Sequence, residues 1–179
     1  MEPSARNARL QPYRDDFAEE SRMKLADFIC FGATIPQLQA TDRNGVIGEL
    51  VNSLHKAGRL SRDNKDKITR AIIRRENEAS TGLGKGVAVP HVKHAAVTAP
   101  VAVVGLSSGG IDFKALDKRP VYSVILLVSP ADDAESHLKT MECLFGHLQN
   151  EKFRSFLRQA KTAAEVEDLL READENPSL

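Results

Sequence analysis

The first half of the chain carries two helical patterns of apolar residues. Apolar side chains recur every three or four positions from residue 46 to residue 57, and Gly58 follows the last of them. This spacing predicts a helix with one buried face that ends at the glycine, with Thr41 in front of it as a capping residue. A second pattern of the same period predicts another helix, capped by Ser61 and running to about Arg75.

Strand patterns dominate the centre of the chain. Residues 101–106 and 121–128 are nearly continuous apolar runs rich in β-branched side chains, as expected for strands that are covered on both faces. A shorter apolar strand, residues 87–89, is expected to end at Pro90. Residues 34–39 alternate apolar with polar side chains and include a proline, which predicts a short edge strand.

Helical periodicity returns after Pro130. Apolar residues between 138 and 148 form one stripe, and residues 153–157 predict a further short helix. A Thr162-x-x-Glu165 capping box precedes the apolar positions of a last helix. Helices thus stand on both sides of a strand-rich centre. This order predicts an α/β fold, a single domain with a mixed, mostly buried β-sheet flanked by helices on both sides.

The two ends of the chain differ in composition from its centre. Residues 1–23 are rich in Arg, Asp, Glu and Pro and show no sustained apolar period, so we expect a mobile or loosely docked extension. The folded domain is expected to span residues 24–173, with residues 174–179 as a C-terminal tail. A chain of 179 residues fits one such domain and is long enough to bury a substantial core.

Charge and composition exclude several classes of partner. Lys plus Arg equals Asp plus Glu at 25 each, so no net charge draws the chain to nucleic acid or to anionic lipid. Aromatic residues make up 5% of the chain and Trp is absent, which argues against base-stacking surfaces. The start of the chain lacks the apolar stretch of a secretory signal, and the longest apolar runs are too short to span a bilayer. We therefore expect a cytoplasmic protein that neither binds nucleic acid nor inserts into a membrane.

Metal and cofactor chemistry has little support in the sequence. Cys30 and Cys143 lie far apart and neither belongs to a Cys-x-x-Cys pair, so we expect two small buried thiols in a reducing compartment. A metal site built from His91, His94 and His137 is an alternative, but no carboxylate or cysteine spacing supports it. We expect neither a metal nor an organic cofactor.

His91 stands where a strand meets a loop. It directly follows an apolar strand and a proline, and a loop with Gly82, Gly84 and Gly86 precedes that strand. Such a position presents a side chain at the rim of a sheet, and glycines allow backbone N–H groups to approach an anion. The loop is neither a P-loop nor a dinucleotide fingerprint, because the required spacing and the following helix are missing. A structural surface histidine is the alternative.

His137 and an arginine pair are the other candidates. His137 opens a helix after the turn of residues 129–133, where the positive end of the helix dipole discourages protonation. A neutral imidazole there can hydrogen-bond an oxyanion, although a partly exposed helical histidine without a role is the alternative. Arg74 and Arg75 end a helix, where they either serve the helix dipole and solvent or aim a guanidinium fork at phosphate oxygens.

The remaining histidines are expected to be ordinary. His55 and His147 fall inside predicted helices with charged or polar neighbours. His94 lies near His91 but in a loop, and an accessory role is an alternative for it.

One continuous segment resembles a known family. It begins with Arg75-Glu76, continues with Ser80-Thr81-Gly82-Leu83-Gly84 and ends with Gly86-Val87-Ala88-Val89-Pro90-His91. This string resembles the signature of enzyme IIA domains of the fructose/mannitol type, from the bacterial sugar phosphotransferase system. The similarity continues through residues 111–121 to Pro130 and His137-Leu138, and covers roughly residues 24–171. The stand-alone nitrogen-regulatory enzyme IIA is the branch that the sequence resembles most.

The resemblance implies a role for each candidate. It implies that His91 is the phosphorylated nucleophile, through its Nε2 atom, that His137 hydrogen-bonds the phosphate and that Arg75 clamps its charge. It also places three loop residues close to the phosphate, namely Ser80, Thr81 and Gly82. This assignment requires the imidazoles of His91 and His137 to converge on one shallow site. Ala79 and Val92 stand where the family often has glycine, and Glu78 adds a negative charge, but no reacting group is missing.

The resemblance also implies partners. The phosphoryl donor would be a histidine-phosphocarrier protein, and the acceptor an enzyme IIB domain. The alternative is a regulatory module, in which phosphorylation of His91 switches the binding of a target protein without onward transfer. Because no IIB or membrane segment is visible in the sequence, we lean towards regulation. A scaffold without phosphotransfer is disfavoured because His91, His137 and Arg75 are all present.

Overall fold

The computed structural model describes residues 22–176 and 178–179. Residues 1–21, most of the predicted N-terminal extension, lie outside the described residues. The described part contains no helix that is both long and apolar enough to cross a membrane.

Helices form the two ends of the described chain. Two short ones come first, α2 (Leu25–Phe28) and the 3-10 helix η1 (Phe31–Ala33). A pair of long helices follows, α3 (Arg43–Lys56) and α4 (Arg62–Glu78). After the strands come three more, α5 (Ala134–Leu148), α6 (Glu151–Gln159) and α7 (Ala163–Glu175).

A mixed sheet lies between these helices. Its strands are β1 (Gly82–Gly84), β2 (Val87–Ala88), β3 (His91–His94), β4 (Val101–Ile111) and β5 (Val121–Pro130). The central strand is β5, with β4 antiparallel along one side. Along its other side β2 and then β3 pair with it in parallel, one after the other, and β1 pairs with β2.

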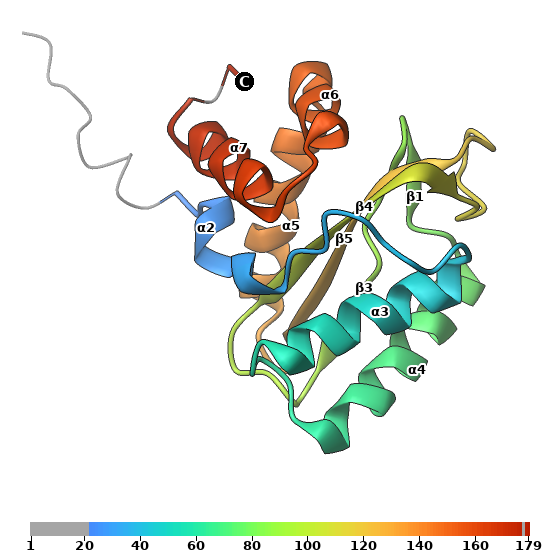
Figure 1. Ribbon diagram of the computed structural model, residues 1–179. Helices are drawn as coiled ribbons and strands as arrows, with labels where there is room; N and C mark the ends of the chain where they lie inside the picture. Colours follow the sequence, from blue (N-terminus) through green and yellow to red (C-terminus); the bar gives the residue numbers. More distant parts are fainter. Residues whose placement is uncertain (1–21, 177) are drawn as a thin grey trace, which may run out of the picture.

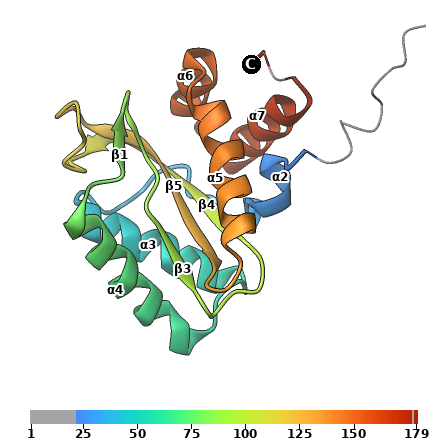
Figure 2. The ribbon, with the colours of Figure 1, turned by 180° about the vertical axis from the view of Figure 1, so that it is seen from behind.

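Two apolar layers cover the sheet. Figure 1 shows α3 and α4 on one face, and Figure 2, from behind, shows α2, α5, α6 and α7 on the other. Val124 and Leu126 of β5 pack into the core under α3 and α4, whereas Ile125 and Leu127 pack under the opposite layer. Both faces of β5 are therefore buried, which is why its sequence is continuously apolar. The predicted single-domain α/β fold is confirmed.

Most predicted helices are present, with changes at their ends. Asp42, and not Thr41, caps α3, because its carboxylate accepts the Gly45 N–H (2.9 Å). Gly58 follows α3 with a positive φ, as a C-terminal glycine should. The first two residues of the predicted tail, 174 and 175, belong to α7, which continues to Glu175.

The predicted edge strand at residues 34–39 is wrong. The segment is extended beside β4, and the N–H groups of Ile35 and Leu38 donate to the carbonyls of Val104 and Leu106. Only Ile35 forms a bridge to the sheet, opposite Gly105. The alternating pattern correctly marks a half-buried extended segment, but it does not guarantee a continuous ladder of hydrogen bonds.

Candidate functional site

A break in the sheet edge places His91. The predicted strand 87–89 ends one residue early, at Ala88, and a separate strand, β3, begins at His91, where a loop was expected. In β3, His91 is aligned with Leu127 of β5. Val89 turns its N–H to the Thr81 carbonyl (3.1 Å), while Pro90 accepts the Leu127 N–H (3.0 Å). The break frees the Val89 carbonyl oxygen, which lies 2.8 Å from Nδ1 of His91.

This contact fixes the protonation pattern of a neutral His91 ring. A carbonyl oxygen only accepts hydrogen bonds, so Nδ1 of His91 must carry the proton. The other nitrogen, Nε2, is then left with a lone pair. His91 is only partly buried, so this lone pair belongs to an imidazole that a partner molecule can approach.

His137 reaches the same place from α5. Asp133 caps that helix by accepting the Ser136 N–H (2.9 Å), and His137 lies in its first turn. Nδ1 of His137 lies 2.8 Å from Oγ of Ser129, a fully buried residue near the end of β5. Since Ser129 is aligned with Lys93 in β3, the hydroxyl lies beside the strand that carries His91.

The two imidazoles meet. Their ring centroids are 5.7 Å apart with the planes tilted by 37°, so the predicted convergence of His91 and His137 is observed. Burial is the main cause that lowers the pKa of His137, and positive charge on His91, whenever that ring is protonated, and on Lys93 acts in the same direction. His137 is therefore neutral at pH 7 and can serve as a hydrogen-bond donor or acceptor.

Arg75 lies in the last turn of α4, which packs beside β3. Its Nη1 donates to the carbonyl oxygen of Ala79 (2.9 Å). Among the described residues no hydrogen bond or ion pair joins this guanidinium to either imidazole. The structure thus brings the two histidines together, whereas the role of Arg75 stays a prediction.

The next residue, Glu76, holds the turn after α4. Its side chain is buried, with 2% of the residue exposed, and its carboxylate accepts both the N–H (3.0 Å) and the hydroxyl of Thr81. Because the Thr81 carbonyl in turn receives the Val89 N–H, this carboxylate supports the segment that ends in His91. Sequence reasoning assigned no role to Glu76, although its place in the Arg75-Glu76 pair was a signal.

Ser80 and Gly82 have structural partners of their own. The Ser80 hydroxyl donates to the Phe113 carbonyl (2.6 Å) and accepts the Gly82 N–H (3.1 Å). A Cβ at Gly82 would lie only 2.7 Å from the Cβ of Ala115, so packing requires a glycine there. The predicted closeness of Ser80, Thr81 and Gly82 to a phosphate stays a prediction.

The glycine loop forms a tight turn that lies far from His91. Gly84, Lys85 and Gly86 all have positive φ (83°, 58° and 78°), and the Lys85 N–H donates to a carboxylate oxygen of Asp117 (3.0 Å). Gly86 accepts the N–H of Tyr122 (2.8 Å), at the opposite end of β5 from Ser129. The expected contribution of this loop to a concavity at His91 is therefore not seen.

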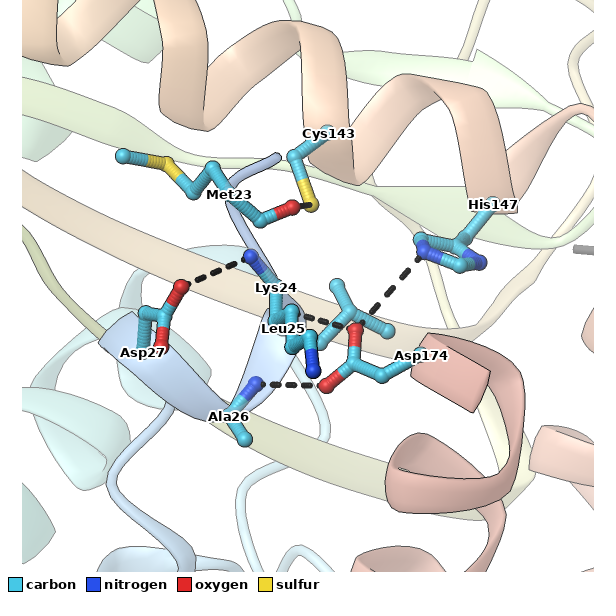
Figure 3. Close-up of polar contacts among 8 residues, drawn as sticks. All are labelled: Met23, Lys24, Leu25, Ala26, Asp27, Cys143, His147 and Asp174. Carbon is cyan, nitrogen blue, oxygen red and sulfur yellow. Dashed lines mark hydrogen bonds and ion pairs between the residues drawn. The ribbon is translucent and has the colours of Figure 1, made fainter. Parts of the chain in front are cut away.

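Two other histidines differ in their surroundings. His94 ends β3, and its Nδ1 accepts the Ala96 N–H (3.0 Å). His147, expected to be ordinary, is buried against α7 with 8% of its surface exposed, and its Nε2 lies 3.9 Å from Asp174. Figure 3 shows this pair beside α2. No local pattern predicts this pair, because the two residues lie on different helices.

Comparison with known proteins identifies the class. The family model described as "Phosphoenolpyruvate-dependent sugar phosphotransferase system, EIIA 2" matches residues 32–173, which is most of the chain. The chain belongs to this family, as the resemblance of residues 75–91 indicated.

The similar proteins include one of about the same length as the match and one that is much longer. The fructose-specific EIIA component of Haloferax volcanii is 35% identical over 133 residues, which cover 74% of this chain and 85% of that protein. The fructose-specific EIIABC component of Bacillus subtilis is 30% identical over 152 residues, 85% of this chain, but the match spans only 24% of that longer protein.

Solved structures show the same fold. The nitrogen regulatory protein IIA-Ntr of Neisseria meningitidis superposes with a TM-score of 0.72 at 25% identity, over 80% of this chain and 97% of that one. The Escherichia coli mannitol enzyme IIA, solved in complex with phosphorylated mannitol enzyme IIB, has a TM-score of 0.65 at 20% identity, over 79% of this chain and 95% of that one.

Proposed function

We propose that this protein is a phosphotransfer protein that accepts a phosphoryl group on Nε2 of His91. The observation that carries the proposal is the hydrogen bond between Nδ1 of His91 and the Val89 carbonyl, beside the imidazole of His137. In the forward step the Nε2 lone pair forms a bond to phosphorus, and the bond from phosphorus to the donor's nitrogen breaks. No metal or organic cofactor takes part.

Ser129 and His137 supply a donor for the phosphate. If the Ser129 hydroxyl donates to Nδ1 of His137, then Nε2 of His137 carries the proton and faces outward as a hydrogen-bond donor. The lowered pKa of His137 supports this neutral form. A fixed donor next to His91 stabilises the charge on the phosphoryl oxygens during transfer.

Positive charge at the site comes from two elements. We assign Arg75 as the charge clamp, because it ends a helix that packs along β3 and engages the Ala79 carbonyl with only one of its nitrogens. Lys93 adds a second cation, because it shares one face of β3 with His91 and its charge acts on His137. We also propose that Ser80, Thr81 and Gly82 lie close to the bound phosphate.

The proposed donor is a histidine-phosphocarrier protein and the proposed acceptor an enzyme IIB domain. The mannitol enzyme IIA of the same fold was solved with phosphorylated enzyme IIB. Leu138, next to His137, is 57% exposed and offers an apolar contact at the rim of the site for such a partner.

A regulatory switch is the second candidate, and the similarity to nitrogen regulatory protein IIA-Ntr favours it. In that case phosphorylation of His91 adds negative charge next to His137 and changes which target protein binds, without onward transfer.

Carrier-dependent phosphorylation with an intact-mass readout tests the proposal. The protein is incubated with phosphorylated carrier, and it should gain the mass of one phosphoryl group. His91→Ala should gain none, whereas the matched variant His94→Ala, altered on the same strand, should be phosphorylated like the parent. Full phosphorylation of His91→Ala would exclude the assignment.

Adding a IIB domain to the phosphorylated protein then separates the two candidates. Movement of the phosphoryl group to IIB supports transfer. Retention of the group, together with phosphorylation-dependent binding of a target protein, supports regulation.

A further inference from the structure

A second, positively charged cleft lies at the other end of the sheet. It has a volume of about 530 Å³ and is formed by the β1–β2 turn, the start of β5 and one side of α6. Its lining includes Lys85, Arg119, Tyr122, Arg154 and Arg158. Figures 1 and 2 show α6 near this end of the sheet, where the 112–120 connection leads into β5.

This cleft is separate from the histidine site. Tyr122 stands at the start of β5 and Ser129 near its end, seven residues further on. At roughly 3.3 Å per residue along a strand, the two places are about 23 Å apart. A ligand in the cleft therefore does not touch His91 or His137.

The cleft concentrates positive charge. Four cationic side chains line it against one carboxylate, that of Glu151. Within the described part of the chain, no ion pair is formed by Lys85, Arg119, Arg154 or Arg158. Like charges gathered around one cavity repel each other, and a bound anion relieves that repulsion. On a chain with no net charge, such a cluster is a local feature of this surface.

Arg158 is held in a geometry that suits anion binding. Its guanidinium carbon lies 3.5 Å from the centre of the Tyr122 ring. Stacking uses the flat face of the guanidinium and leaves its N–H groups free at the edge, where they can bind phosphate or carboxylate oxygens. The ring packs closely against two glycines, because a Cβ at Gly86 or Gly110 would lie only 3.3 or 3.1 Å from it.

The side chain of Arg154 and the backbone of Lys85 and Arg119 are also held by hydrogen bonds. Arg154 extends from the same side of α6, and its Nη1 donates to the carbonyl oxygens of Leu148 (2.8 Å) and Gln149 (2.7 Å). Across the cleft, the backbone N–H groups of Lys85 and Arg119 both donate to the carboxylate of Asp117 (3.0 Å each). One carboxylate thus holds together the two segments that carry Lys85 and Arg119.

We propose that this cleft binds a small phosphorylated molecule with two or more negative charges. The cations on the two walls would share its phosphate oxygens, and Pro120 with the edge of Tyr122 offers apolar surface for its uncharged part. The cleft volume lies within the range of small-molecule sites, which run from about 300 to 1,000 Å³. Such a molecule would not compete with a phosphoryl donor for His91, because it binds far from the histidines.

Titration with inorganic pyrophosphate, followed by backbone amide NMR of the full-length protein at low ionic strength, tests the proposal. Saturable shifts are expected at Gly86, Arg119 and Ser155, which line the cleft. Arg158→Gln should weaken binding at least tenfold. The matched control is Arg171→Gln, an arginine that lies over the Phe31 ring (4.7 Å) on another helix, and it should bind like the parent.

Two further arms make the outcome decisive. His91→Ala should bind pyrophosphate in the cleft as the parent does, so the result does not depend on the phosphotransfer site. Single phosphate should bind more weakly, because it spans only part of the cleft. The proposal is overturned if the cleft amides do not shift, or if Arg158→Gln and Arg171→Gln lower the affinity equally while both retain the parent's dispersed spectrum.

Discussion

The two imidazoles of the site are held by different kinds of partner. A backbone carbonyl can only accept, so Val89 dictates which nitrogen of His91 bears the proton. A hydroxyl can donate or accept, so the contact with Ser129 allows either neutral tautomer of His137. A phosphate bound at Nε2 would select the tautomer that carries its proton there. This difference suits the proposed roles, because a nucleophile needs one fixed lone pair and its companion needs one donor.

Ser129→Ala tests whether the Ser129 hydroxyl keeps the proton of His137 on Nε2. Loss of the hydroxyl removes the bond that keeps the Nε2 proton facing the phosphate, so phosphorylation of His91 should slow by roughly three- to tenfold, the equivalent of one neutral hydrogen bond. Imidazole ¹⁵N shifts should report a changed tautomer at His137 in the same variant. The control is Ser123→Ala, at another buried serine of the same strand. It should change neither the phosphorylation rate nor the ¹⁵N shifts of His137. If Ser129→Ala were phosphorylated at the parent's rate, the Ser129 hydroxyl would have no part in the transfer.

Single residues were predicted better than their contacts. The position of His91 after a strand and a proline marked it from the sequence alone. Its bond to Val89 was not predictable, because it depends on how the chain breaks at Pro90 beside β5. Ser129 had no signal beyond standing before a turn, although its buried hydroxyl is the direct partner of His137.

Elements with a long apolar period were predicted from the sequence, whereas the short strands β1 and β3 were not. The stripes of α3 and α5 and the apolar runs of β4 and β5 are intrinsic to local sequence. The division of one strand into β2 and β3 depends instead on pairing with β5. The connection from α4 to β1 likewise depends on a buried carboxylate, that of Glu76.

Glu76→Gln should weaken that connection. The amide replaces one acceptor oxygen with a donor that faces the Thr81 N–H and hydroxyl, which leaves a buried donor without a partner. The free energy of unfolding should fall by about 1.5–3 kcal/mol, as expected for a hydrogen bond to a charged group. Urea denaturation measures this loss, with Glu78→Gln, exposed on the same helix, as the control. Equal stability of the two variants would contradict the role given to Glu76.

At the scale of the whole molecule, the first and last elements of the described chain are in contact. Asp174 of α7 accepts the N–H groups of Leu25 (2.6 Å) and Ala26 (2.9 Å), and so caps α2 from the far end of the chain (Figure 3). Beside it the Cys143 thiol donates to the Met23 carbonyl (3.2 Å), and burial raises the pKa of that thiol to about 11. Asp174 had been predicted to lie in a tail, because local sequence carries no trace of a contact that spans 149 residues.

This junction should make stability depend on pH through His147. Burial is the main cause that lowers the pKa of His147 below its ordinary value near 6.5, with a further decrease from Arg22 and an opposing increase from Asp174. The unfolded chain therefore binds the proton more readily, so stability is complete above pH 6.5 and falls as the pH drops towards the pKa of the folded state. His137, whose pKa is also lowered, acts in the same direction.

Urea midpoints measured between pH 8 and pH 5 should consequently decrease towards acid in the parent protein. His147→Gln should flatten this decrease in part, and combination with His137→Gln should flatten it further, because each substitution removes one group that protonates on unfolding. Asp112 and Asp117 do not interfere, since their lowered pKa values place their titration below about pH 4. If His147→Gln kept the parent's full slope, burial at the junction of α2, α5 and α7 would not be what sets the acid sensitivity of the fold.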